Sequence, residues 1–108
     1  MKRISLAPYT GDVYYAKTYA EMRKLHLRMT GREPDCAEVG VNGAMIALEK
    51  RGYAPNYLVF GSRPSTVAHE MSHVALEVFS NIGTDPRTGG GEPFCYLLGH
   101  LMDEAMRK

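Results

Sequence analysis

The sequence predicts a small α+β domain in which helices and a small mixed or antiparallel sheet share one core. Residues 18–29, 64–80 and 92–106 carry apolar side chains at helical spacing, three and four positions apart. The short apolar runs between the first two segments are bounded by Gly, Pro and Asn, as strands usually are. A chain of 108 residues suits a single core, so we expect one domain spanning residues 1–108.

The composition is that of a globular protein that binds neither nucleic acid nor a membrane. Hydrophobic residues make up 44% of the chain and charged residues 23%, which are ordinary values. The formal net charge of +1 predicts no basic surface for DNA, RNA or anionic lipid. No apolar run is long enough to cross a membrane, and the first residues lead into Pro8 and Tyr9 instead of a signal segment. We therefore expect a cytoplasmic protein.

The chain has two cysteines, Cys36 and Cys95, which are too few for a disulfide framework and lack C-x-x-C spacing. We therefore expect both to be reduced structural thiols. Cys95 is also a minor candidate for a metal ligand, since thiolates bind zinc.

The first third of the chain predicts a hairpin followed by a helix. Residues 3–7 and 12–16 are β-prone and are separated by turn-forming residues, which indicates two short strands. Thr18 and Glu21 have the spacing of a capping box, so a helix should begin there and stop at Gly31. Its expected buried stripe consists of Met22, Leu25 and Met29. Tyr19 and His26 are expected on the flank of that stripe. The histidine should pack and not bind a metal, because no second ligand type accompanies it.

The middle of the chain predicts three further strands. Asn42-Gly43 between residues 37–41 and 44–48 predicts a β-hairpin, because a tight two-residue turn needs positive φ at both positions. Another strand is expected at residues 57–60. Residues 62–65 then supply a break and an N-terminal cap for the next helix.

The helix expected over residues 64–80 carries the motif His69-Glu70-Met71-Ser72-His73. Residues four apart lie one above the other on a helix, so the two imidazoles can converge on one ion. Glu70 lies on the flank of that face, where it can reach a metal-bound water. The side expected to be polar consists of His69, Glu70, His73, Glu77 and Ser80. The side expected to be buried consists of Val67, Met71, Val74, Val78 and Ile82.

A glycine-rich segment and a last helix complete the chain. Residues 83–91 should form a mobile loop without regular structure, and they lack the Gly-Lys-Ser/Thr of a nucleotide-binding loop. The helix should begin at Glu92-Pro93 and continue to Met106. Its expected buried face consists of Phe94, Leu97, Leu98, Leu101 and Ala105. Its expected polar face consists of Glu92, Tyr96, His100, Asp103 and Arg107.

A catalytic zinc ion normally has three protein ligands and a water, so two histidines leave one protein ligand to be found. Glu92 is the first candidate, because it follows the motif helix after a glycine-rich reversal and opens the next helix on its polar face. His100 is the second candidate, and Asp85 and Cys95 are the remaining ones. Stabilisation of the helix dipole would also favour a carboxylate at position 92.

The motif and the order of elements resemble the zincin metallopeptidases. More narrowly, the chain is similar to the gluzincins, in which a glutamate on a later helix completes the H-E-x-x-H site. Glu92 lies 19 positions after His73, a separation like theirs, although its neighbours differ from their N-E-x-x-S-D pattern. The chain also looks like the very small zincins of bacteriophage genomes. The resemblance implies a minimal zincin-like domain, with His69 and His73 as zinc ligands and Glu70 as general base.

The mechanism implied by such a site is metal-assisted hydrolysis. Zn²⁺ lowers the pKa of its bound water toward about 7, Glu70 takes the proton, and the metal stabilises the oxyanion. Tyr96 or His100, on the polar face of the last helix, can donate a further hydrogen bond to the oxyanion. The resemblance also implies that an edge strand holds the substrate backbone, for which residues 44–48 are the first candidate and 57–60 the second.

The sequence therefore predicts a zinc-dependent metallopeptidase, or a related amide hydrolase, that acts on peptide or protein. The alternative is a catalytically inactive binding or regulatory protein that keeps a zincin scaffold with structural zinc. A third hypothesis is that the motif occurs by chance in a helical core. The small chain leaves little surface for substrate subsites, whereas the intact Glu70 favours catalysis.

Overall fold

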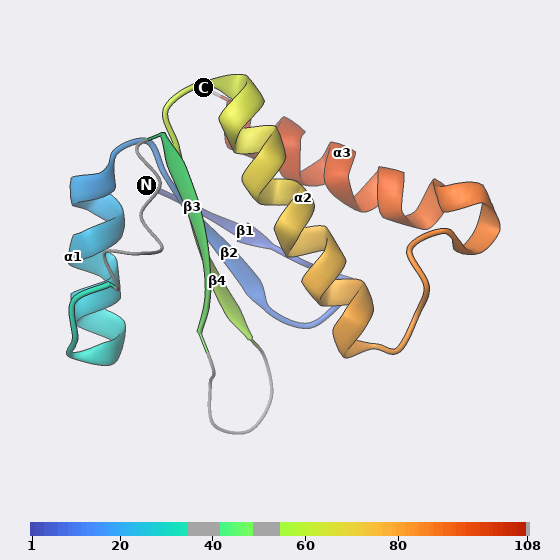
Figure 1. Cartoon of the computed structure of the whole chain (residues 1–108), viewed down its shortest axis with the longest axis horizontal. Helices are drawn as coiled ribbons and strands as arrows, with labels where there is room; N and C mark the ends of the chain where they lie inside the picture. Colours follow the sequence, from blue (N-terminus) through green and yellow to red (C-terminus); the bar gives the residue numbers. More distant parts are fainter. Residues whose placement is uncertain (35–41, 49–54, 108) are drawn as a thin grey trace.

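A four-stranded mixed sheet lies at the centre of the molecule (Figure 1). The computed structural model describes residues 1–34, 42–48 and 55–107. Within these ranges the strands are β1 (Lys2–Ser5), β2 (Asp12–Ala16), β3 (Gly43–Leu48) and β4 (Asn56–Gly61), in the sheet order β1-β2-β4-β3. The pairs β1–β2 and β3–β4 are antiparallel, whereas the central strands β2 and β4 are parallel. The expected α+β class is confirmed.

Helices cover both faces of the sheet. α1 (Tyr19–Thr30) packs on one face, and α2 (Pro64–Asn81) and α3 (Glu92–Met106) pack side by side on the other (Figure 1). α1 follows β2 and α2 follows β4, so the connections from the two parallel strands go to opposite faces. In the described part of the chain, no helix is long and apolar enough to span a membrane.

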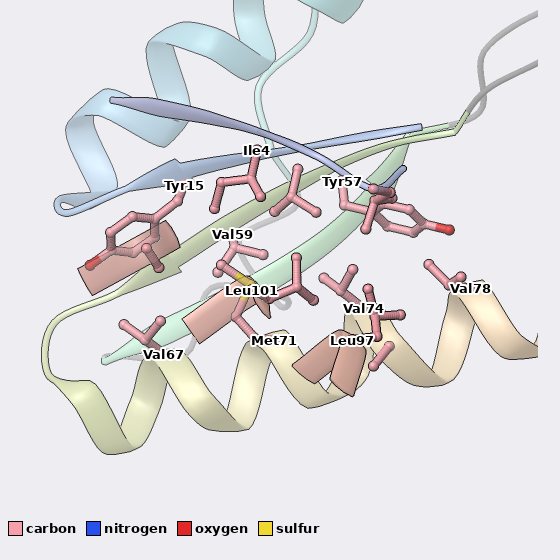
Figure 2. Packing of buried hydrophobic residues seen from close by; sticks show 14 of the residues in the cluster. Ile4, Tyr15, Tyr57, Val59, Val67, Met71, Val74, Val78, Leu97 and Leu101 are labelled. Atoms are coloured by element: carbon pink, nitrogen blue, oxygen red, sulfur yellow. The ribbon is translucent and has the colours of Figure 1, made fainter. Parts of the chain in front are cut away.

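The larger core lies between the sheet and the layer of α2 and α3. Figure 2 shows Val67, Met71, Val74 and Val78 of α2 directed at the sheet, where Val59 of β4 meets them. Burial of each such side chain contributes about 1.5–3 kcal/mol, so this stripe fixes the rotation of α2 about its axis. The smaller core beneath α1 consists of Ala16, Met22, Leu25, Ala44, Ile46, Leu58 and Phe60.

The hairpin and the helix predicted for the N-terminal third are confirmed, as is the threonine half of the capping box. β1 and β2 form an antiparallel hairpin in which Ser5 lies opposite Asp12. The Thr18 hydroxyl accepts a hydrogen bond of 3.2 Å from the Glu21 amide, which satisfies a free donor in the first turn of α1. α1 ends at Gly31, whose φ of 73° is left-handed.

Two residues expected in the core are exposed. Met29, in the last turn of α1, is 37% exposed. The buried His26 donates a hydrogen bond of 2.7 Å from Nδ1 to the Arg32 carbonyl oxygen, so it packs as expected. Ile82 is 50% exposed, because α2 ends at Asn81 and its apolar stripe ends with it.

The predicted hairpin at Asn42-Gly43 is wrong. Gly43 is the first residue of β3, and its φ is not positive, as the tight turn would require. β3 pairs with β4 instead, with Gly43 opposite Gly61. The glycine serves packing, since a Cβ there would lie 2.4 Å from Cγ2 of Thr66 in α2. Residues 37–41, the expected partner strand, lie outside the described residues.

The segment between α2 and α3 includes a short turn, η2 (Thr88–Gly91), in which Gly89 and Gly90 are not helical. Its three glycines have positive φ values between 64° and 81°, which a residue with a side chain rarely adopts. The Asp85 carboxylate accepts a hydrogen bond of 2.8 Å from the Arg87 amide just before the turn. The glycines thus reverse the chain within a few residues of the start of α3.

Candidate metal centre

Helix α2 brings His69 and His73 together on its exposed outer face. Their Nε2 atoms are 3.3 Å apart, and their ring centroids are 4.9 Å apart with 75° between the ring planes. The helix begins at Pro64, whose fixed φ suits the first turn. Its N-cap, Arg63, makes no side-chain capping hydrogen bond, so the cap expected from residues 62–65 is wrong. Sheet packing rather than a cap therefore holds this end of α2.

The separation of the two imidazoles fits two ligands of a tetrahedral zinc ion. Imidazole nitrogens bind zinc at about 2.0–2.1 Å, and tetrahedral geometry then places two of them about 3.4 Å apart. The observed distance of 3.3 Å between His69 Nε2 and His73 Nε2 is close to this value. It also suits a hydrogen bond between the two rings, in which one imidazole donates to the other. The spacing of the pair is therefore compatible with two ligands of one metal ion.

Glu70 joins this pair from a buried position. One potential ligand atom from each of Glu70, His69 and His73 lies within 4.8 Å of the other two. We expected Glu70 on the open polar side, but it is only 7% exposed. At about 100° per residue it is rotated about 60° from His73, toward β3, and that strand covers it. A carboxylate held beside two imidazoles and partly shielded from solvent is suited to accept a proton from a water between them.

Two glycines allow β3 and β4 to approach α2 at this point. A Cβ on Gly43 would lie 2.4 Å from Thr66 Cγ2 and 3.4 Å from Glu70 Cγ. A Cβ on Gly61, its partner across the strand pair, would lie 2.7 Å from Val67 Cγ2. Because protein interiors are close-packed, a larger residue at either position would displace the first turns of α2. The position of Glu70 therefore depends on this glycine pair.

Sequence reasoning missed the role of these glycines. It assigned Gly43 to a turn because Asn-Gly is the strongest short hairpin signal. The sequence does contain a signal for this role. Gly43 and Gly61 each adjoin an apolar strand, and glycine at such a position often marks the close approach of another element.

Glu92, the first candidate for the third ligand, is not brought to this cluster. In the described part of the chain, no further metal-binding side chain joins the three of α2. α3 packs on a different flank of α2, where the rings of Phe79 and Phe94 are 5.8 Å apart. Phe79 is rotated about 120° from His73 around the helix axis. Glu92 is exposed at the start of α3, and its role as a ligand stays a prediction.

Tyr96 and His100, the expected oxyanion donors, lie at a separate place. His100 Nε2 donates a hydrogen bond of 3.2 Å to the carbonyl oxygen of Ser5 in β1, which is at the opposite edge of the sheet from β3. Tyr96 is 75% exposed. Together with Pro8 and Tyr9 they border a cavity of about 190 Å³. Neither residue joins the cluster on α2, so their catalytic roles stay predictions.

The remaining candidate ligands also lie outside the cluster. Asp85 forms an ion pair of 3.0 Å with Arg87, and the hydrogen bonds from Arg87 hold the pKa of the Asp85 carboxyl below its ordinary value. Cys95 is free, as expected, and it is exposed. Cys36 lies outside the described residues.

The sheet order decides between the two candidate substrate strands. β3 is at an edge of the sheet as described, with β4 as its one paired neighbour there. β4 lies between β2 and β3, so residues 57–60 cannot accept an additional strand and this second candidate is wrong. β3 is also the strand that contacts α2 at Glu70, through Gly43. Residues 44–48 therefore remain the candidate for binding an extended peptide.

Comparisons of the chain with protein-family models, curated proteins and solved structures found no match. The fold and the cluster therefore have to be interpreted from their own geometry. That geometry establishes an α+β fold and a His-Glu-His group on α2 that can hold a metal ion.

Proposed function

We propose that the protein is a zinc-dependent metallopeptidase, or a related amide hydrolase, that acts on peptide or protein. The main support is the distance of 3.3 Å between the Nε2 atoms of His69 and His73, with the Glu70 carboxylate in the same cluster. In metal-assisted hydrolysis, one helix can supply two imidazole ligands for the metal and an adjacent carboxylate as the general base.

The residues of α2 divide the chemistry between them. His69 and His73 would hold the ion through Nε2, and zinc bound there supplies a water of pKa about 7 and an electrophile for the carbonyl oxygen. Glu70 accepts the proton of the attacking water and delivers it to the leaving amine. Its packing against Gly43 holds the carboxylate in one place and limits its contact with bulk water. The Glu70 side chain therefore does not have to change its conformation before it accepts the proton.

The edge of the sheet supports a peptide as the substrate. β3 is an edge strand among the described strands, and it lies directly beside Glu70. An extended peptide that pairs with residues 44–48 gains main-chain hydrogen bonds and lies alongside the cluster. A small amide would gain none of these bonds.

Glu92 is retained as the first candidate for the third protein ligand. It is an exposed carboxylate, and the residues before it are the glycines of η2. Glycines permit changes of backbone conformation that other residues resist, so the first turn of α3 can shift when a metal binds. Ligation by Glu92 requires such a shift, because α3 packs on another flank of α2.

Zinc content and hydrolysis test this function together. The purified protein should contain about one zinc per chain by mass spectrometry, as one cluster of this kind can hold. It should cleave fluorescein-labelled casein, and 1,10-phenanthroline should stop the cleavage. Glu70→Gln keeps the size of the side chain and removes its basicity, so it should retain zinc and lose at least about 100-fold in rate.

Glu77→Gln provides the matched control, since Glu77 is an exposed glutamate on the same helix. It should cleave casein at the wild-type rate. Cleavage by Glu70→Gln at a near wild-type rate would contradict the mechanism.

Among the described residues, the cluster contains two imidazoles and one carboxylate, which are fewer ligands than a structural zinc site has. If Glu70 is the general base, they are also fewer than the three protein ligands of a catalytic zinc ion, and this shortage favours the alternative of a catalytically inactive binding or regulatory protein. A protein that retains zinc, cleaves neither casein nor a mixed peptide library, and is unaffected by Glu70→Gln would support that alternative.

A further inference from the structure

The carboxyl ends of the parallel strands β2 and β4 border a second cavity, of about 280 Å³. None of the residues of the metal cluster lines it. The chain leaves β2 at Ala16 toward α1 on one face and leaves β4 at Gly61 toward α2 on the other face. Open sheets preferentially bind ligands in such crevices, where neighbouring parallel strands send their connections to opposite faces.

Three cationic side chains line this crevice, and no acidic side chain of the described residues does. Lys17 follows β2, Arg63 is the N-cap of α2, and Arg107 follows α3, so the charges come from three separate elements. Arg107 pairs with Glu104 at 2.9 Å on the exposed surface. Lys17 and Arg63 make no side-chain ion pair with other described residues. In a chain whose formal net charge is +1, this is a local concentration of positive charge.

A neutral hydrogen-bond donor and the N-terminal end of α2 also favour an anion in this crevice. Tyr15 lines the crevice, and burial, followed by the nearby charge of Glu21, raises the pKa of its hydroxyl, which therefore stays protonated as a donor. The first turn of α2 has no acidic residue and no side-chain cap. Its positive end is therefore not compensated from within the helix.

We propose that this crevice binds the phosphate group of a small phosphorylated molecule. Lys17, which follows β2, and Arg63, which follows β4, hold the phosphate. The guanidinium of Arg63 can bond two phosphate oxygens at once. Arg107 joins them by exchanging Glu104 for the ligand. A phosphate dianion fits better than a carboxylate, because a single negative charge would leave most of the surrounding positive charge unpaired.

Calorimetric titration of the full chain with inorganic phosphate at low ionic strength tests the proposal. Phosphate should bind saturably with a stoichiometry near one, and its Kd should rise with added salt. Arg63→Gln should raise the Kd by about tenfold or more, and Lys17→Gln by a smaller factor. Arg87→Gln, which removes the same charge from an exposed arginine of another turn, should leave the Kd unchanged. Far-ultraviolet circular dichroism checks the fold of each variant.

Two further titrations distinguish binding in the crevice from binding at the metal cluster and from general attraction of anions. The His69→Ala variant should bind phosphate like the wild type, because His69 does not line the crevice. Acetate should bind more weakly than phosphate. Absence of saturable binding, equal weakening by Arg87→Gln, loss of binding in His69→Ala, or acetate binding as tight as phosphate binding would each overturn the proposal.

Discussion

Helices α2 and α3 lie side by side on one face of the sheet, and similar amphipathic patterns in their sequences have different outcomes. On α2, the predicted apolar stripe is buried from Val67 to Val78, and the pair His69 and His73 faces outward together. On α3, the predicted polar face divides: His100 bonds to β1, whereas Glu92 is exposed at the helix start. Periodicity thus predicts which side of a helix faces the core, but it does not predict which neighbour lies on each flank.

The largest expected effect is on zinc affinity, when the removal of an imidazole from α2 is compared with the removal of one from α3. His69→Ala should weaken zinc binding by more than the roughly 10- to 100-fold that loss of an outer hydrogen-bond partner costs, because it removes a ligand. His100→Ala should leave zinc affinity unchanged, since His100 lies beside β1. Competition with a fluorescent zinc chelator measures both affinities. Full zinc occupancy in His69→Ala, or its loss in His100→Ala, would reverse the assignment of the two helices.

The second prediction asks whether α3 contributes to the metal centre at all. Glu92→Gln should weaken zinc binding by about tenfold or more while leaving the melting temperature of the zinc-free protein near its wild-type value. Asp103→Asn removes another exposed carboxylate of α3 and serves as the control. If both variants bind zinc like the wild type, the third ligand is not Glu92, and α2 holds the metal without help from α3.

A third prediction compares two glycines, one beside α2 and one within α3. Gly43→Ala should destabilise the protein by about 1–3 kcal/mol, because its Cβ would overlap Thr66. Gly99→Ala should stabilise it by about 0.5–1 kcal/mol, because Gly99 is in a helix and a Cβ there meets no atom within 4 Å. Urea unfolding measures both free energies. Equal stabilities of the two variants would show that β3 and α2 are less closely packed than described.

The smallest expected effect concerns the turn that joins the two helices. Arg87 lowers the pKa of Asp85 in the folded protein, so this interaction stabilises the fold above the ordinary carboxyl pKa and is lost as the pH falls through the lowered value. Asp85→Asn should therefore lower the melting temperature slightly at neutral pH and not at all in strong acid. The difference should be small, because the pair is exposed and solvent screens it. A larger difference in acid than at neutral pH would contradict this sign.

Most features that depend on nearby residues were predictable, although the cap expected from residues 62–65 was not formed. Features that depend on distant residues were not predictable. The pairing of His69 with His73 needs only the helical spacing of four, and the cap at Thr18 needs only a span of three. The burial of Glu70 depends on β3, which is more than twenty residues away in the sequence. The position of Glu92 depends on how α3 packs, which periodicity leaves undetermined. The function of Gly43 was hidden for the same reason.

The placement of both imidazoles on one helix also has a consequence for the order of folding. A metal bound by His69 and His73 crosslinks a single turn, so zinc can bind as soon as that turn forms. Glu70 reaches its buried position only after β3 has docked on α2. In mild denaturant, hydrogen exchange should therefore show amides of the histidine turn protected by zinc while the β3 amides still exchange. Metal capture would then precede completion of the site, and a partly folded chain would hold zinc before it could perform any chemistry.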